Sequence, residues 1–195
     1  MGLDEPLSPC ERPNWVQLFA CLGALVPLCA MPLSSASAQA PVGMVQVRFV
    51  ESAPADTFLF TNTGDCDLGR SEVWLDLRPS IAGLVFDVSD GGAGLDRFHR
   101  LEITEGGEFI HRVSKLKDGS TALHFQLERL PVGGTIAFKA DIDDTLSPED
   151  SRGGNTQVFE SELEGVHFKV NDVSVLFAAQ ASATAVGLDC MTEPS

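Results

Sequence analysis

The feature that most constrains the fold of this chain is an alternation of apolar and polar residues that recurs from residue 44 onward. In residues 44–50, Val45, Val47 and Phe49 alternate with polar side chains. Successive side chains of a β-strand point to opposite faces, so this pattern predicts a strand with one buried face. The same alternation occurs in residues 122–128, 135–143 and 166–177. No convincing 3.6-residue period of an amphipathic helix accompanies it.

Turn signals separate these stretches at intervals of about 8 to 15 residues. They include "NTGD", "SDGGAG", "KDG", "PVGG" and "RGGN". Short strands with one buried face, joined by frequent turns, are typical of two antiparallel sheets packed face to face. The sequence therefore predicts an all-β antiparallel sandwich of about nine or ten strands, either immunoglobulin-like or jelly-roll-like.

The first 38 residues have the pattern of a secretory signal peptide. An apolar run covers residues 15–31, and Ala36-Ser37-Ala38 fits the small-residue rule for cleavage before Gln39. The run is shorter than the ~20 residues of a spanning helix, which favours a signal over an uncleaved membrane anchor. The acidic segment before the run is unusual for a signal. We expect a signal peptide at 1–38 and one domain at 39–195, in a secreted, periplasmic or cell-surface protein without a stable membrane span.

Cleavage at this point would leave two of the five cysteines, Cys66 and Cys190. Two cysteines in an exported chain indicate one disulfide. A pair of metal-binding or catalytic thiols is the alternative, although neither cysteine has a CxxC partner or a nearby histidine.

The net charge of −15 narrows the class of partner. Such a surface repels the phosphates of nucleic acids and attracts divalent cations or basic partners. We therefore expect no nucleic-acid partner.

The densest acidic stretch is "ADIDDTLSPED", residues 140–150. If Phe138, Ala140 and Ile142 point inward, Asp141 and Asp143 lie on the outward face, and Asp144 follows at the strand end. Carboxylate oxygens at such a junction are ligands that Ca²⁺ prefers, so calcium is the candidate cofactor. Two alternatives stay open: a solvated acidic loop, and an acid pair of a glycoside hydrolase. Other acidic turns contain Asp87, Asp90 and Asp96.

Enzyme signatures are otherwise absent from the sequence. It contains no G-x-S-x-G, P-loop, HExxH or dinucleotide-binding motif. The four histidines are scattered along the predicted strands and are expected at the surface. Trp74 alternates with Val73 and Leu75, so it should face outward, where it is a candidate ligand contact.

Three segments resemble a known group of exported bacterial proteins, the aggregation factor core proteins, which are named after the sponge cell-aggregation proteoglycan. The segments are "VRFVESAPADTFLFTNTGDCDLG", "VWLDLRPSIAGLVFDVSDGGAG" and "DGSTALHFQLERLPVGGTIAFKADIDDT", and the resemblance extends over residues 44–190. It implies an exported β-sandwich with paired cysteines and, by analogy with the sponge assembly, calcium-dependent adhesion. The chain lacks the tandem repeats and N-glycosylation sites expected of the sponge core.

Together these observations predict a non-enzymatic adhesion or cell-surface interaction protein, assisted by calcium. Its partner would be a cell-surface protein, a polysaccharide or a second copy of itself. The alternatives are a carbohydrate- or polymer-binding module and a secreted hydrolase that uses Asp141 and Asp143.

Overall fold

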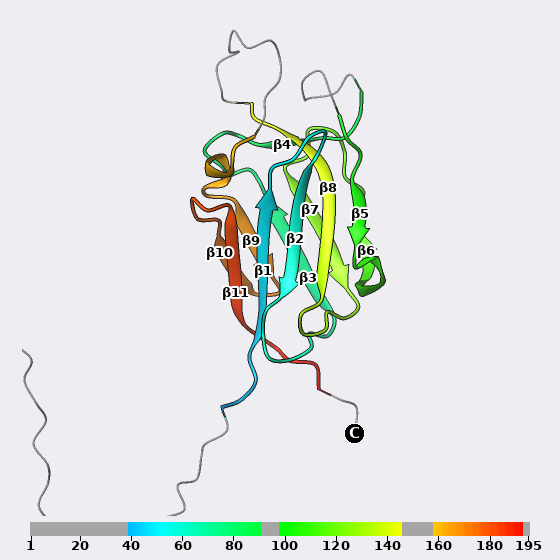
Figure 1. Ribbon diagram of the computed structural model, residues 1–195, viewed down its shortest axis with the longest axis vertical. Helices are drawn as coiled ribbons and strands as arrows, with labels where there is room; N and C mark the ends of the chain where they lie inside the picture. The colour runs from blue at the N-terminus through cyan, green and yellow to red at the C-terminus, as the bar shows by residue number, and fades with distance from the viewer. Residues whose placement is uncertain (1–38, 91–97, 146–157, 193–195) are drawn as a thin grey trace, which may run out of the picture. The chain divides into compact units, whose positions relative to one another are not determined.

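A computed structural model describes residues 39–90, 98–145 and 158–192 (Figure 1). Gln39–Ser195 forms one compact unit. The predicted signal peptide at 1–38 lies outside the described residues, as do Asp96 and residues 146–150 of the acidic stretch.

Eleven strands and two short 3₁₀ turns make up the described part of the chain. The strands are β1 (Gly43–Val50), β2 (Asp56–Asn62), β3 (Ser71–Asp76), β4 (Val85–Asp87), β5 (Glu102–Glu105), β6 (Ile110–Val113), β7 (Ala122–Leu127), β8 (Thr135–Asp143), β9 (His167–Val170), β10 (Val173–Leu176) and β11 (Ser182–Leu188). The 3₁₀ turns are η1 (Gly107–Phe109) and η2 (Glu160–Leu163).

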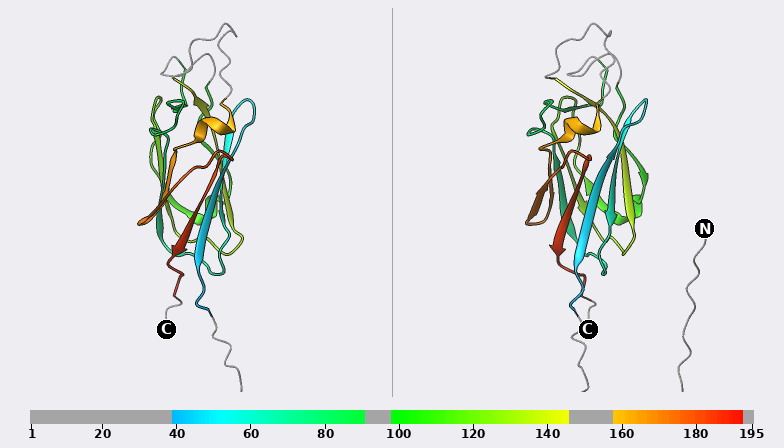
Figure 2. Two further views of the ribbon diagram at one scale, coloured as in Figure 1. Left: turned by 90° about the vertical axis from the view of Figure 1, so that its left-hand side faces the viewer. Right: turned by 60° about the vertical axis from the view of Figure 1, so that its left-hand side comes forward.

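These strands form two antiparallel sheets packed face to face, which confirms the predicted sandwich (Figures 1 and 2). One sheet has the order β11-β1-β2-β8-β4, with β5 also paired to β8, and the other has the order β10-β9-β3-β7-β6. The strand number exceeds the predicted nine or ten. Among the strands that the sequence pattern does not mark, β4 has three residues, and β5 is exposed at every position.

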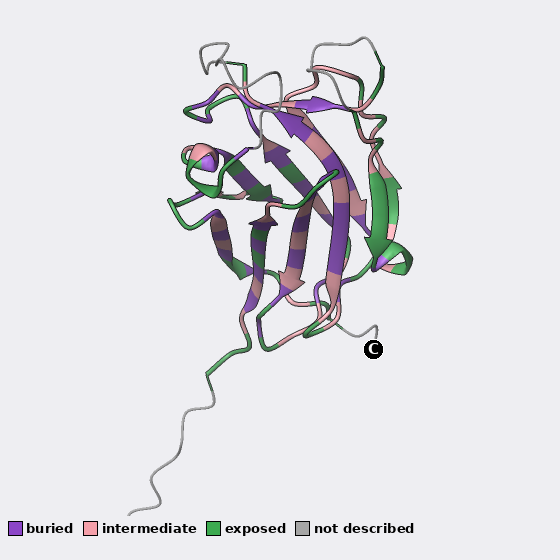
Figure 3. Cartoon of the chain, turned by 45° about the horizontal axis from the view of Figure 1, so that its top comes forward, coloured by how far each residue is buried: buried purple, intermediate pink, exposed green. Residues whose placement is uncertain are grey.

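The alternation of apolar and polar residues in the sequence matches the alternation of more and less buried residues along the strands (Figure 3). Along β2, buried and half-buried residues alternate without a break from Asp56 to Asn62. In β3, Val73 and Leu75 are buried while Trp74 is exposed, as predicted. Alternation therefore selected the correct inward face on these strands, because only one face of each sheet meets the other sheet.

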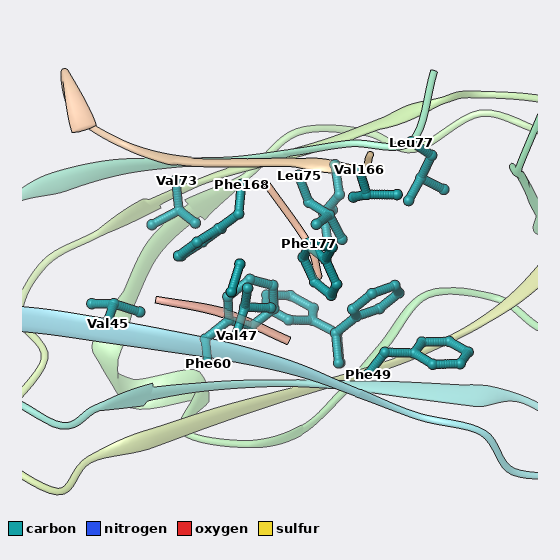
Figure 4. Close-up of a cluster of buried hydrophobic side chains, with 14 of the residues drawn as sticks. Val45, Val47, Phe49, Phe60, Val73, Leu75, Leu77, Val166, Phe168 and Phe177 are labelled. Atoms are coloured by element: carbon teal, nitrogen blue, oxygen red, sulfur yellow. The ribbon is translucent and has the colours of Figure 1, made fainter. Parts of the chain in front are cut away.

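Phenylalanines from both sheets interlock in the middle of the core. Phe60 on β2 contacts Phe125 on β7 edge to face, with ring centroids 5.1 Å apart, and contacts Phe168 on β9 at 5.9 Å. Figure 4 shows Phe60 with Val45 and Val47 on one side of the core, and Val73 and Phe168 on the other. Burying each such ring contributes about 1.5 to 3 kcal/mol, so this cluster holds the sheets together.

The predicted disulfide joins Cys66 and Cys190, with 5.6 Å between their Cα atoms. It ties the connection between β2 and β3 to the chain that follows β11, at the end of the sandwich where the described chain begins and ends (Figure 1). Isolated bridges from Leu68 to Cys190 and to Leu130 hold the same region by backbone hydrogen bonds.

The long strand β8 places the acidic residues at the opposite end of the sandwich (Figure 1). One side of β8 pairs with β2, while its other side pairs first with β5 and then with β4. Residues 141–143 of β8 pair with β4, whereas the pairing with β2 ends at Ala140.

Candidate functional site

Two aspartates face each other across the pairing of β4 and β8. Asp87 lies opposite Asp141, and Val85 lies opposite Asp143. Directly opposed residues of an antiparallel pair project to the same face, with Cβ atoms about 5 Å apart. Only 1% of Asp87 and 5% of Asp143 is exposed, so these side chains are not spread in solvent. Asp141 is half-buried. The burial of Asp87 and Asp143 differs from the solvated outward face that the sequence alone suggested, because the sequence pattern did not reveal the pairing with β4.

Burial and mutual repulsion raise the pKa values of the paired carboxyl groups. Desolvation raises the pKa of Asp87 to about 7, with further contributions from a hydrogen bond to Asp118 and from the charge of Asp143. Desolvation and the charge of Asp143 raise the pKa of Asp141 to about 6. Carboxyl groups that share a buried space resist simultaneous ionisation. Near neutral pH, this end of the sandwich therefore retains protons that free aspartates would release.

Asp56, at the start of β2, is a third aspartate with a raised pKa, and it lies opposite Ala140, the neighbour of Asp141 on β8. Burial raises its pKa to about 7, and the charges of Asp141 and Asp143 add to the effect. The backbone N–H of Ser52 donates a hydrogen bond to Asp56 Oδ1 at 3.2 Å. We call Asp56, Asp87, Asp118, Asp141 and Asp143 the acidic cluster.

One oxygen of the acidic cluster is both buried and unsatisfied. Asp87 Oδ1 is inaccessible to solvent and has no hydrogen-bond partner. Asp118, which shares a hydrogen bond with Asp87, also accepts the backbone N–H groups of Val88 at 3.0 Å and Ser89 at 3.2 Å. A buried oxygen without a donor carries the full desolvation cost of that atom, which a proton or a cation would offset.

The tentative calcium ligands Asp141, Asp143 and Asp144 follow one another around the end of β8. Within residues 39–90, 98–145 and 158–192, no group of three or more His, Cys, Asp or Glu side chains is arranged to hold a metal ion. The calcium site therefore stays a prediction. Asp90, from another acidic turn, is exposed.

Sequence reasoning identified Asp141 and Asp143 and noted Asp87, but it missed Asp56 and Asp118. Asp56 opens a strand and Asp118 lies in the "KDG" turn, where aspartate is common for local reasons. No spacing rule connects them to Asp141, because only strand pairing brings β2, β4 and β8 together.

The second candidate surface is the outer face of the five-stranded sheet, around Trp74. The indole is 41% exposed and stacks on the imidazole of His124, with ring centroids 3.8 Å apart and planes 17° apart. The two residues lie directly opposite each other on β3 and β7. Lys169 on β9 lies opposite Trp74 on its other side.

Hydrogen bonds fix the orientation of this stack. Glu72 contacts His124 Nε2 through one carboxylate oxygen, and Gln126 Nε2 donates to the other at 2.8 Å. The hydrogen bonds from Gln126 and His124 lower the pKa of Glu72. A carboxylate held in this way aligns the imidazole, and the imidazole supports the indole. We call Trp74, His124, Glu72 and Gln126 the aromatic platform.

The four histidines lie on different segments of the described chain. His99 pairs with Glu102 at 3.6 Å, and His111 pairs with Glu128 at 3.5 Å. His124 belongs to the aromatic platform, and His167 lies exposed on β9.

A cleft of about 510 Å³ opens along the edge of the sandwich where β5 and β6 lie. Ile103 on β5 and the preceding Leu101 line it on one side, and Val113 on β6 and Leu116, which follows β6, line it on the other. Neither Asp141 nor Asp143 is among its lining residues.

Comparison with known proteins finds no matching family model, no matching curated protein and no matching solved structure. The fold and these sites define a disulfide-closed antiparallel β-sandwich with an acidic cluster at one end and an aromatic platform on one face. The resemblance to aggregation factor core proteins stays a prediction. In the part of the chain that the structure describes, no helix is long and apolar enough to cross a membrane.

Proposed function

We propose that this protein is an exported, non-enzymatic interaction protein that adheres to cell-surface polysaccharide or protein through the outer face of its five-stranded sheet. The observation that carries the proposal is the aromatic platform, in which an exposed Trp74 stacks on His124. The disulfide is consistent with export, because such bonds persist in oxidising compartments.

The platform has the properties of a contact surface for sugars. An indole held in one orientation offers a large apolar surface at little cost in conformational entropy, and tryptophan is frequent among residues that dominate binding. Around it, Lys169 and Gln126 provide N–H donors, and Glu72 provides acceptors. A sugar ring stacked on the indole would find these polar groups at its edge.

The alternative of a secreted hydrolase has less support. A glycosidase acid pair must reach its substrate from two sides of one bond. Asp143 is 5% exposed, and neither Asp141 nor Asp143 lines the cleft between the sheets. The raised pKa of Asp141 agrees with a catalytic acid, but burial among other aspartates explains it without catalysis.

Calcium would assist adhesion by neutralising the acidic cluster. The cluster is costly to ionise, and Asp87 Oδ1 lacks a partner. A divalent cation would replace the protons that these carboxyl groups retain near neutral pH and would order the end of the sandwich. This part of the proposal can fail while the platform remains the contact surface.

The direct test is binding of the full-length, oxidised chain to insoluble cellulose, chitin and peptidoglycan, and to the surface of intact bacterial cells. Trp74→Ala should weaken binding at least tenfold, which corresponds to about 1.4 kcal/mol. His124→Ala should weaken it less, because the indole remains but loses its support.

Phe98→Ala is the matched control, since Phe98 is another aromatic residue with 41% exposure, outside the five-stranded sheet. It should bind like the unmodified chain. Equal binding by Trp74→Ala and Phe98→Ala would exclude the platform as the contact surface. Failure to bind any polysaccharide or cell surface would contradict the adhesion proposal itself.

A further inference from the structure

The cleft at the β5–β6 edge has properties that the proposed adhesion function does not use. Within the described residues, β5 pairs with β8 and β6 pairs with β7, and each strand is the last of its sheet on this side of the sandwich. The cleft lies between these two edges, and an isolated bridge from Phe86 to Ser120 joins β4 to the chain before β7 nearby. The β5 and β6 labels lie together along one edge in Figure 1, opposite the edge formed by β10 and β11.

The lining of the cleft is mostly apolar, with Ser114 among its polar groups. Val88 and Leu101 line it from one side, and Val113 and Leu116 line it from the other. All four are partly buried and pack against the core of the sandwich. Ile103, with 40% exposure, extends this apolar lining toward solvent. The volume of about 510 Å³ lies within the range of about 300 to 1,000 Å³ that is typical of small-molecule pockets.

The rim of the cleft is cationic, although the chain as a whole is strongly acidic. Arg100 and Lys115 both line the cleft and are exposed. Neither makes an ion pair with the described residues, whereas Arg70 and Arg78 are paired with carboxylates.

Nearby carboxylates are engaged elsewhere. Glu102 lies 3.6 Å from the imidazole of His99, and Asp118 accepts hydrogen bonds from the backbone of Val88 and Ser89. Among the described residues, neither cation at the rim is paired with a carboxylate.

An apolar interior with unpaired cations at its mouth fits a ligand that has a hydrocarbon chain and an anionic head. We propose that this cleft binds a single medium-chain fatty acid, with its chain between the two sheets and its carboxylate held by Arg100 and Lys115. The guanidinium and ammonium groups would donate charge-assisted hydrogen bonds to the carboxylate. Burial of the chain methylenes against the apolar side chains of the cleft would add to the affinity.

The test uses the full-length, oxidised chain and sodium decanoate below its micellar concentration, with binding followed by isothermal titration calorimetry. Decanoate should bind with one-to-one stoichiometry. Acetate, which has the head group without the chain, should give no detectable binding. Decyltrimethylammonium, which has the same chain with a positive head, should bind at least tenfold more weakly.

Variants connect the binding to the cleft. The double variant Arg100→Gln, Lys115→Gln should weaken decanoate binding at least tenfold. The matched control Arg48→Gln, Lys139→Gln removes two cations that do not line the cleft and should leave the affinity unchanged. Ile103→Glu adds a negative charge at an already exposed position and should abolish decanoate binding. Circular dichroism confirms that each variant is folded.

Three results would overturn the proposal: no binding of decanoate, equal binding by the folded double variant, or equal affinity for decanoate and decyltrimethylammonium. Binding to phosphatidylglycerol vesicles without binding to monomeric decanoate would also overturn it, because the ligand would then be a membrane surface. None of these results depends on the aromatic platform, so the cleft and the proposed adhesion surface are tested separately.

Discussion

Asp87 on β4 lies directly opposite Asp141 on β8, and both carboxyl groups hold protons more tightly than free aspartates do. With Asp56, their pKa values are about 7, 6 and 7 in the folded chain, compared with about 3.9 in an unfolded one. Between pH 4 and 7 the folded state therefore binds more protons than the unfolded state. The raised pKa values stabilise the folded state fully below pH 4, and this stabilisation is lost as the pH rises through 7. We expect the melting temperature to fall between pH 5 and pH 8, as measured by circular dichroism.

Asp87→Asn should remove much of this pH dependence. The amide is neutral at every pH in this range, and its N–H₂ group can donate to Asp118 as the protonated carboxyl group does. We expect stabilisation of about 1 to 2 kcal/mol at pH 8, or roughly 2 to 8 °C in melting temperature, and little change at pH 5. Asp90→Asn, at an exposed position in the chain that follows β4, is the control and should retain the full slope. An unchanged slope in Asp87→Asn would exclude Asp87 as a source of the effect.

Calcium should stabilise the full-length, oxidised chain against heat if the end of β8 binds it. A ligand at 100 times its Kd adds about 2.7 kcal/mol to the free energy of unfolding, visible as a shift of several degrees. The shift should disappear in Asp141→Asn, Asp143→Asn and persist in Asp172→Asn, Asp189→Asn, which removes two exposed carboxylates elsewhere. An equal shift with magnesium, or none with either ion, would argue against a calcium site.

Removal of the disulfide should destabilise the sandwich without changing its fold. Cys66 and Cys190 are 124 residues apart, so the bond restricts a long loop in the unfolded chain. Cys66→Ser, Cys190→Ser should lower the free energy of unfolding in urea by about 3 to 5 kcal/mol. Reduction of the unmodified chain should give a similar loss, whereas the double variant should be insensitive to reductant.

Gly106, between β5 and η1, should tolerate no side chain. Its φ is 69°, and a Cβ atom would lie 2.2 Å from the carbonyl oxygen of Thr135. Gly133 has a similar φ of 72°, but a Cβ atom there would meet nothing within 4 Å. Gly133→Ala should therefore show the cost of the backbone conformation alone, about 1 kcal/mol. Gly106→Ala should cost clearly more in urea unfolding, and equal losses would show that the contact with Thr135 relaxes freely.

Local sequence patterns predicted the sandwich and much of its core. Alternation in residues 44–50, 122–128 and 135–143 marked the inward faces of β1, β7 and β8, because sheet burial repeats every two residues. The disulfide followed from the number of cysteines that remain after residue 38. The strand β5 was not predicted, since all four of its residues are exposed and carry no alternation.

The sequence by itself determined which side chains point inward, that Trp74 faces outward, and which cysteines pair. The direction of a side chain depends on its position along one strand, and the cysteine pair depends on the number of cysteines after residue 38. Only the tertiary structure decided that β4 lies beside the end of β8, so that Asp87 meets Asp141 and Asp143 becomes buried. It also decided that Trp74 stacks on His124, fifty positions further along the chain, and that Arg100 and Lys115 border one cleft. The physical reason is that strand pairing uses backbone hydrogen bonds, which are the same for almost every residue. The partners of a strand are therefore selected by the packing of the whole sandwich.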